Sequence, residues 1–98
     1  IYKRDVMKAL LFSNDGCGSC RKWKPTFIKL MDKYKIDYEV IDNFKDRERA
    51  KQYNVRGIPL TVFVNNQGVE LGSVLGSMLE ELADRDIQYY LRKDAEGN

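Results

Sequence analysis

Two cysteines lie close together near the start of the sequence, in the tetrapeptide Cys17-Gly18-Ser19-Cys20. They are the only cysteines of the chain, which also has no histidine. A disulfide between them closes so small a loop that it removes little entropy from the unfolded chain. Zinc and iron–sulfur sites need about four such ligands, so one chain cannot form either without sharing the site with a second chain. The pattern therefore favours a redox-active Cys17–Cys20 disulfide, with no metal and no other cofactor.

The dithiol lies between an expected strand and an expected helix. Residues Met7–Phe12 are apolar apart from one lysine, which is typical of a buried strand, and residues 13–16 have loop composition. From Cys17 onward, apolar side chains recur at the three- and four-residue steps of a helix: Cys20, Trp23, Phe27, Leu30, Met31 and Tyr34. Because the first turn of a helix has free N–H groups and a positive dipole end, we expect it to stabilise a thiolate at Cys17.

The two thiols should have different roles in disulfide exchange. Cys17, at the exposed end of the helix, attacks a substrate disulfide and forms a mixed disulfide. Cys20, one turn further in, is expected to be buried; it attacks Cys17 and releases the reduced substrate. Gly18 and Ser19 are small and allow a partner chain to approach, and Arg21 adds a positive charge that would favour the thiolate. A purely structural cysteine pair is the alternative, and the strand–loop–helix context argues against it.

The rest of the sequence predicts further strands and helices in alternation. Tyr38–Ile41 has the composition of a strand, and Asp46–Tyr53 that of a short charged helix at the surface. Leu60–Val64 and Val69–Leu75 are expected to form a hairpin around a turn at residues 65–68. The predicted order β-α-β-α-β-β-α gives an α/β fold, with a central mixed sheet of about four strands and helices on both faces.

Three features concern the shape and the ends of the helices. Pro25 lies inside the first helix and should bend it. Ser77 and Glu80 have the spacing of a capping box, which predicts Ser77 as the N-cap of the last helix. Residues 92–98 are polar and are expected to form a frayed tail.

Composition places residues 1–98 in a single domain. The net charge of +2, from 17 basic and 15 acidic residues, is too small to suggest a nucleic-acid or membrane partner. No apolar run approaches the roughly 18 residues of a membrane span. A monomer is the default expectation. The sequence begins at Ile1 rather than at methionine and leaves the compartment open, with the cytoplasm favoured.

Four features together resemble the thioredoxin family. They are C-G-x-C after an apolar strand, Pro25 five residues beyond Cys20, the segment V-R-G-I-P at residues 55–59, and Asn66-Gln67-Gly68 followed eight residues later by Gly76. The resemblance extends from Met7 to Leu91, and the combination is far more specific than the cysteine spacing alone.

The resemblance implies a thioredoxin-like fold and a thiol–disulfide oxidoreductase that reduces protein disulfides. It also implies a cis bond between Ile58 and Pro59, with Pro59 packed against the cysteines; an ordinary trans turn is the alternative. The backbone of Ile58 would pair with an extended substrate strand, and Gly76 would leave one side of the groove open. The implied partners are disulfide-containing proteins and a thioredoxin-reductase-type electron donor.

Two alternative functions share this fold. One is a disulfide oxidant or isomerase, and the other is a redox-inactive module that binds peptides. The retained cysteine pair and Ile58-Pro59 argue against a pure binding scaffold, which would need neither thiol. A glutaredoxin is disfavoured, because neither C-G-S-C nor R-G-I-P has the usual form of that family.

The sequence departs from the family inside and beside the cysteine motif. Gly16 stands where the family usually has a tryptophan, so Cys17 should be more exposed to substrate. Ser19 stands where the family usually has a proline. By analogy with the family, this serine favours a less strongly reducing dithiol.

A second departure concerns the buried acid–base pair of the family. Leu11 stands where the family has a buried aspartate, and the lysine paired with that aspartate aligns with Tyr38 or Val40. The chain therefore lacks the group that helps to deprotonate the second cysteine. We expect Cys20 to attack the mixed disulfide more slowly for this reason.

Overall fold

Seven elements follow one another in the predicted order, in a computed structural model that describes residues 7–96. They are β1 (Lys8–Ser13), α1 (Gly18–Tyr34), β2 (Asp37–Asp42), α2 (Arg47–Gln52), β3 (Leu60–Val64), β4 (Glu70–Leu75) and α3 (Glu80–Ala95). Each predicted strand and helix is present, with small shifts at the ends. None of the described helices is both long and apolar enough to cross a membrane.

The described strands form one four-stranded mixed sheet in the order β2-β1-β3-β4. β1 and β2 are parallel, because α1 carries the chain back across the sheet between them. β3 pairs antiparallel with both β1 and β4. A tight turn joins β3 to β4, and in it the Asn65 side chain accepts hydrogen bonds from the N–H groups of Gln67 and Val69 (2.8 and 3.0 Å). The predicted α/β fold with a mixed sheet is confirmed.

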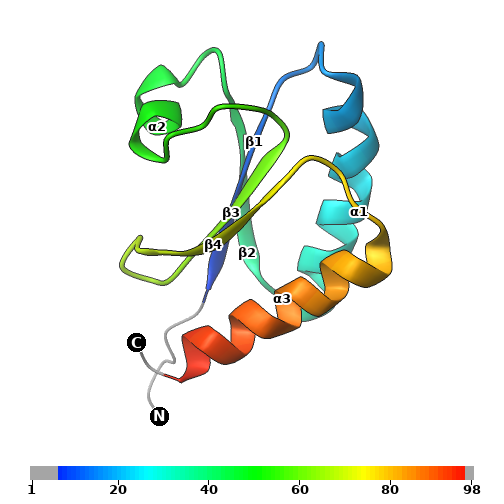
Figure 1. The fold of residues 1–98 in the computed structure, drawn as a ribbon, viewed down its shortest axis with the longest axis vertical. Helices are drawn as coiled ribbons and strands as arrows, with labels where there is room; N and C mark the ends of the chain where they lie inside the picture. The colour runs from blue at the N-terminus through cyan, green and yellow to red at the C-terminus, as the bar shows by residue number, and fades with distance from the viewer. Residues whose placement is uncertain (1–6, 97–98) are drawn as a thin grey trace.

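Helices cover both faces of the sheet: α1 and α3 lie on one face and α2 on the other (Figure 1). Side chains along a strand point alternately to opposite sides, so β1 serves both faces. One core contains Ala9 and Leu11 of β1 together with Trp23, Phe27, Leu30, Ala83 and Ile87. The other core contains Leu10 and Phe12 of β1 together with Ile41, Val62 and Val64. Because both cores hold β1, they also fix where its end leads into the cysteine motif.

α1 runs without a break from Gly18 to Tyr34, although Pro25 lies inside it. Pro25 has no N–H to donate to the preceding turn, and it is exposed, so its ring displaces no core side chain. The bend expected at this proline stays a prediction. The buried face of the helix is formed, as the periodicity indicated, by Cys20, Trp23, Phe27, Leu30 and Met31.

α3 begins later than the sequence predicts. Its N-cap is Leu79, which makes no capping hydrogen bond through its side chain, so the prediction of Ser77 as N-cap is wrong. Glu80, the expected partner of Ser77 in the capping box, instead forms an ion pair with Lys29 of α1 (Oε2–Nζ 3.1 Å). The ion pair between α3 and α1 therefore forms instead of the capping box that the sequence predicts at the start of α3.

α3 also ends later than predicted. The helix continues through Ala95, so residues 92–95 are helical rather than part of a frayed tail. Lys93 donates a hydrogen bond from Nζ to the carbonyl oxygen of Leu71 in β4 (3.1 Å), which ties the last turns to the sheet. Residues 97–98 of the expected tail lie outside the described part of the chain.

Candidate dithiol site

The first cysteine of the motif caps α1. Cys17 is the N-cap residue, with an extended backbone (φ −93°, ψ 115°). The N–H of Cys20, one of the donors that a first helical turn leaves free, donates to Cys17 Sγ over 3.2 Å. A backbone donor at the positive end of the helix dipole stabilises negative charge on an acceptor placed there. Both cysteines are free thiols.

The second cysteine is the more buried of the two. Cys20 is 3% exposed, whereas Cys17 is half-buried. Burial and a hydrogen bond with the Cys17 side chain raise the pKa of Cys20 to about 11. Cys20 is therefore a neutral thiol at neutral pH. The difference in burial agrees with the predicted division into an accessible nucleophile and a buried resolving thiol.

Hydrogen bonds hold the loop that leads into the motif. Asn14 accepts from the Gly16 N–H at Oδ1 (2.9 Å) and from the Cys17 N–H at its backbone oxygen (3.0 Å). Arg21 reaches back from α1, and its Nη1 donates to the carbonyl oxygen of Asp15 (2.6 Å). The guanidinium predicted to lie near the thiolate is thus tied to the loop before Cys17.

The loop before β3 brings its proline to the cysteines. The peptide bond between Ile58 and Pro59 is cis, which confirms the expectation drawn from the family resemblance. Pro59 is fully buried, and Cys17 Sγ lies 4.0 Å from the carbonyl oxygen of Ile58. The N–H of Gly76 donates to the carbonyl oxygen of Pro59 over 2.7 Å. Three segments distant in sequence therefore meet around the Cys17 sulfur.

Small residues leave this meeting point open. Gly76 has a φ of +82°, a conformation that favours glycine, and a side chain added there would meet no atom within 4 Å. Gly18 has the same open surroundings, and Gly16 and Ser19 are exposed. The structure thus places every residue predicted for substrate binding at the helix start or in the two loops beside it.

The buried acid–base pair of the family has no counterpart in the described residues. Leu11 is completely buried in the core beside α1. The buried polar residues of the described chain are Ser13, Thr61 and Asn65, and none of them ionises near neutral pH. Near Cys20 the buried polar contact is instead neutral: Trp23 Nε1 donates to Thr61 Oγ1 (2.9 Å).

Sequence reasoning missed two features at the site. Asn14 anchors the loop, and its only signal was that asparagine often hydrogen-bonds the backbone two residues ahead. Leu75 and Leu79, which flank Gly76 in the sequence, are large apolar side chains that are 68% and 69% exposed. The sequence placed them at the ends of a strand and a helix, where their exposure depends on the path of the loop between.

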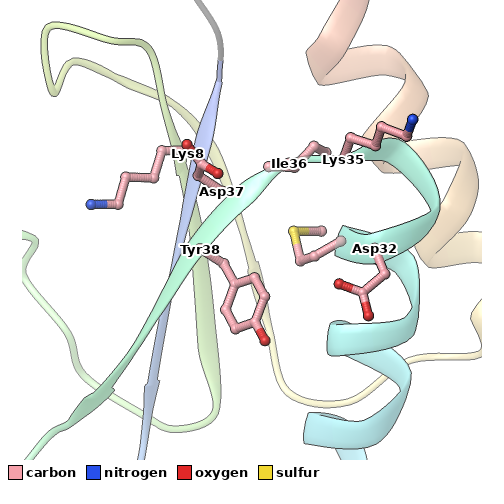
Figure 2. A pocket seen from close by; sticks show the side chains of 7 residues that line it. Lys8, Asp32, Lys35, Ile36, Asp37 and Tyr38 are labelled. Carbon is pink, nitrogen blue, oxygen red and sulfur yellow. The ribbon is translucent and has the colours of Figure 1, made fainter.

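One hollow in the described surface lies far from the dithiol. It has a volume of about 610 Å³ and is lined by Lys8, Met31, Asp32, Lys35, Ile36, Asp37 and Tyr38. Figure 2 shows it between the last turn of α1 and the start of β2, with the Tyr38 ring turned toward the helix. The length of α1, about 25 Å, separates it from Cys17. Within residues 7–96, no three His, Cys, Asp or Glu side chains cluster as metal ligands would.

The sequence model of one protein family, Thioredoxin, matches residues 2–88, which is most of the chain. The chain belongs to the thioredoxin family. It is 31% identical over 71 residues to the chloroplastic thioredoxin-like protein HCF164 of Arabidopsis thaliana, a match covering 68% of this chain and 27% of that protein. This chain therefore spans about a quarter of that relative's length. It is 24% identical over 76 residues to the SPbeta prophage-derived thioredoxin-like protein YosR of Bacillus subtilis, covering 78% of this chain and 90% of YosR.

Solved thioredoxins share the fold. A mutant thioredoxin from Halobacterium salinarum superposes with a TM-score of 0.80 at 25% identity, over 89% of this chain and 76% of that one. The reduced thioredoxin pre-protein of Schistosoma mansoni gives a TM-score of 0.79 at 26% identity, over 88% and 80% of the two chains. Thioredoxin family membership supports a thiol–disulfide oxidoreductase in general.

Proposed function

We propose that this thioredoxin-family chain reduces disulfides in other proteins by dithiol exchange through Cys17 and Cys20. The observation that carries the proposal is the position of Cys17 Sγ, at the start of α1. It lies 3.2 Å from the amide nitrogen of Cys20 and 4.0 Å from the carbonyl oxygen of Ile58, beside cis Pro59. A half-buried sulfur between a helix start and an open loop is placed to meet a disulfide that approaches along that loop.

The exchange has two steps that conserve electrons and protons. In the first, the Cys17 thiolate attacks one sulfur of the substrate disulfide; a Cys17–substrate bond forms, and the released substrate sulfur takes up a proton. In the second, Cys20 loses its thiol proton and attacks Cys17 Sγ. The Cys17–Cys20 disulfide forms, and the second substrate sulfur leaves and is protonated. Counting the proton that Cys17 gives to solvent when it ionises, the dithiol loses two electrons and two protons, and the substrate gains the same number.

The second step should limit the reaction. Burial and the Cys17 hydrogen bond raise the pKa of Cys20 to about 11, so very little of it is ionised at neutral pH. With Leu11 in place of the family's buried aspartate, no described group stands by to take the proton. Solvent must accept it, and the mixed disulfide should persist longer than in relatives that keep the aspartate.

Substrate recognition would rest on the backbone beside the sulfur. Ile58 can offer its main-chain groups to an extended substrate segment, a mode that tolerates many side chains. Gly76 leaves room for that segment, while exposed Leu75 and Leu79 favour apolar side chains on it. We infer disulfide-containing proteins as the substrate class on this basis.

A complete cycle needs an electron donor. The Cys17–Cys20 disulfide must be reduced by the same exchange chemistry, with the donor's thiolate attacking the accessible Cys17 sulfur. We infer a thioredoxin-reductase-type partner, which would use the same open surface as the substrate. We also infer that the chain acts as a monomer, since Cys17 and Cys20 supply both thiols of the exchange.

Reduction of insulin by dithiothreitol tests the proposed function. The wild-type chain should accelerate the precipitation of reduced insulin, and Cys17→Ser should not, because it lacks the attacking sulfur. Cys20→Ser should accumulate mixed disulfides with its substrates. If the wild type and Cys17→Ser both behave like buffer alone, exchange is excluded and a redox-inactive peptide-binding module is the better description.

Ser19 and the missing buried base favour one alternative, a disulfide oxidant or isomerase. Equilibration with glutathione buffers distinguishes it by the reduction potential. We expect a potential less negative than the about −270 mV typical of a thioredoxin. A value as low as that would contradict the role given to Ser19 and support an ordinary reductant. A Ser19→Pro variant should move the potential toward the more negative value.

A further inference from the structure

Asn14 uses its side chain and its backbone to shape the loop between β1 and α1. Its Oδ1 accepts from the N–H of Gly16 over 2.9 Å. Its carbonyl oxygen accepts from the N–H of Cys17 over 3.0 Å. Both peptide groups before the nucleophilic sulfur are therefore held by one residue, in the manner in which asparagine closes a short turn.

The held peptide also sets where the two cysteines meet. The N–H of Cys20 donates to Cys17 Sγ over 3.2 Å, so the position of the Cys17 backbone decides how its sulfur faces Cys20. Burial raises the pKa of Cys20, and the Asn14 backbone acts in the opposite direction.

Asn14 lies beside the end of β2, because the preceding residue, Ser13, pairs with Asp42. The N–H groups of Phe44 and Lys45 donate to Asp42 Oδ1 over 2.9 and 3.2 Å. The Phe44 N–H first, then the Lys45 N–H and the Asn14 side chain, keep the pKa of Asp42 below its usual value. A charged carboxylate is therefore present near the Asn14 side chain at neutral pH.

From Cys17 onward the motif is held by the start of α1, whereas the segment before Cys17 has few contacts besides those of Asn14. Gly16, Gly18 and Ser19 are exposed and have no bulk with which to pack against the protein. Glycine also allows more backbone conformations than any other residue. A loop of this composition keeps one geometry only if hydrogen bonds hold it. Arg21 supplies one such bond, but it reaches only the carbonyl oxygen of Asp15.

We propose that Asn14 is a positioning residue for the dithiol, which holds the N–H groups of Gly16 and Cys17 so that Cys17 Sγ stays aligned with Cys20 while Cys20 attacks it. The inference rests on the proposed function, because it concerns the step in which the Cys17–substrate bond breaks and the Cys17–Cys20 bond forms. Loss of the side chain would remove the acceptor of the Gly16 N–H and let the Cys17 backbone move relative to Cys20. Attack on an outside disulfide does not need this alignment, so the second step should slow more than the first.

The test uses the reduced 98-residue chain and one equivalent of dithionitrobenzoate, a disulfide that releases a coloured thiol at each step. The first release reports attack by Cys17, and the second reports attack by Cys20 on the mixed disulfide. Stopped-flow absorbance separates the two in one trace. Asn14→Ala should slow the second release about two- to tenfold, the range expected for one ordinary hydrogen bond. The first release should change less.

Two further variants separate positioning from a general loss of stability. Asn65 closes the β3–β4 turn with the same kind of contact, accepting two backbone hydrogen bonds at Oδ1, and it lies away from the cysteines. Asn65→Ala should lower the melting temperature and leave both releases unchanged. Asn14→Ser keeps an oxygen that can accept from Gly16 and should recover part of the lost rate.

The proposal is overturned if Asn14→Ala folds and keeps the wild-type second release, or if Asn65→Ala slows that release equally. If Asn14→Ala does not fold, the comparison passes to Asn14→Ser, in which an unchanged second release overturns the proposal. The reagent replaces a protein substrate. If the wild-type chain releases both thiols from the reagent but fails to reduce insulin, the proposed function is contradicted. The inference about Asn14 can then still be tested by the same stopped-flow measurement.

Discussion

At Cys20, burial works against the charge that disulfide exchange requires. The thiol is 3% exposed, and the buried polar residues of the described chain, Ser13, Thr61 and Asn65, carry no charge. The ionisation of this thiol is therefore disfavoured mainly by burial. Where the family has a buried carboxylate that helps to deprotonate the second cysteine, this chain has Leu11. Leu11 packs into the core and cannot take a proton.

Titration of the reduced protein should show this directly. Because burial raises the pKa of Cys20 to about 11, the thiolate absorbance should have a late step close to pH 11. Cys20→Ser should lack that step. A Cys20 that ionises near the ordinary thiol value of about 8.5 would contradict the burial argument.

Residue-level roles were predictable only where the signal was local. The helical spacing from Cys20 to Tyr34 identified which thiol would be buried, because periodicity reports the face of a helix. The cis bond at Pro59 came from the family resemblance, and no spacing in the chain would have given it. The placement of Asn14 beside the end of β2 depends on the pairing of β1 with β2, so the sequence around Asn14 gave no signal of it.

At the scale of elements, α3 packs closely on the edge strand β4. The Tyr90 ring stacks on Phe63, with ring centroids 5.1 Å apart, and lies over Gly72. A side chain at Gly72 would put its first carbon 2.3 Å from the Tyr90 ring, closer than atoms can approach. The absence of a side chain at Gly72 is what allows the helix to lie this close.

Gly72→Ala should therefore destabilise the fold. We expect a loss of about 1–3 kcal/mol, the usual cost of overpacking a core, because Tyr90 must move or the helix must lift. Urea denaturation measures it. Gly18→Ala is the matched control, since its added carbon meets no atom within 4 Å and should leave the unfolding free energy unchanged or slightly higher. Equal effects of the two substitutions would contradict the packing argument.

The elements themselves were largely predictable, and their ends were not. β3 was predicted to the residue, because its apolar run is bounded by a proline and a turn. The start of α3 was wrong, since Glu80 pairs with Lys29 across the helices rather than with Ser77 along its own. Its end was extended by the bond from Lys93 to Leu71. Tertiary contacts decide helix ends, and a single sequence does not show them.

At the scale of the whole molecule, one polar cluster joins the first half of the chain to the second. Asp84 of α3 accepts from Lys33 and Tyr34 of α1, and Gln88 donates to it over 2.9 Å. Hydrogen bonds from Lys33, Tyr34 and Gln88, in that order, lower the pKa of Asp84 to about 2. The cluster holds together the two helices that share one face of the sheet.

Asp84→Asn should lower the melting temperature at pH 7. The carboxyl of Asp84 has a folded pKa of about 2, below its ordinary value of 3.8, so its contribution to stability is present above about pH 4. The contribution is lost as the pH falls toward 2, and the wild type and the variant should converge there. Glu80→Gln, which breaks the exposed pair with Lys29, should have a smaller effect at pH 7. A difference that stays constant from pH 7 to pH 2 would contradict the assignment.

The bond from Lys93 to Leu71 bears on how copies of this chain meet one another. β4 is an edge strand, and unpaired carbonyl groups on such an edge invite a strand from another molecule. Lys93 takes one of these acceptors and places an ammonium group beside it. The ammonium group of Lys93 therefore stands at a place on β4 where pairing with a strand of another copy would lead to aggregation.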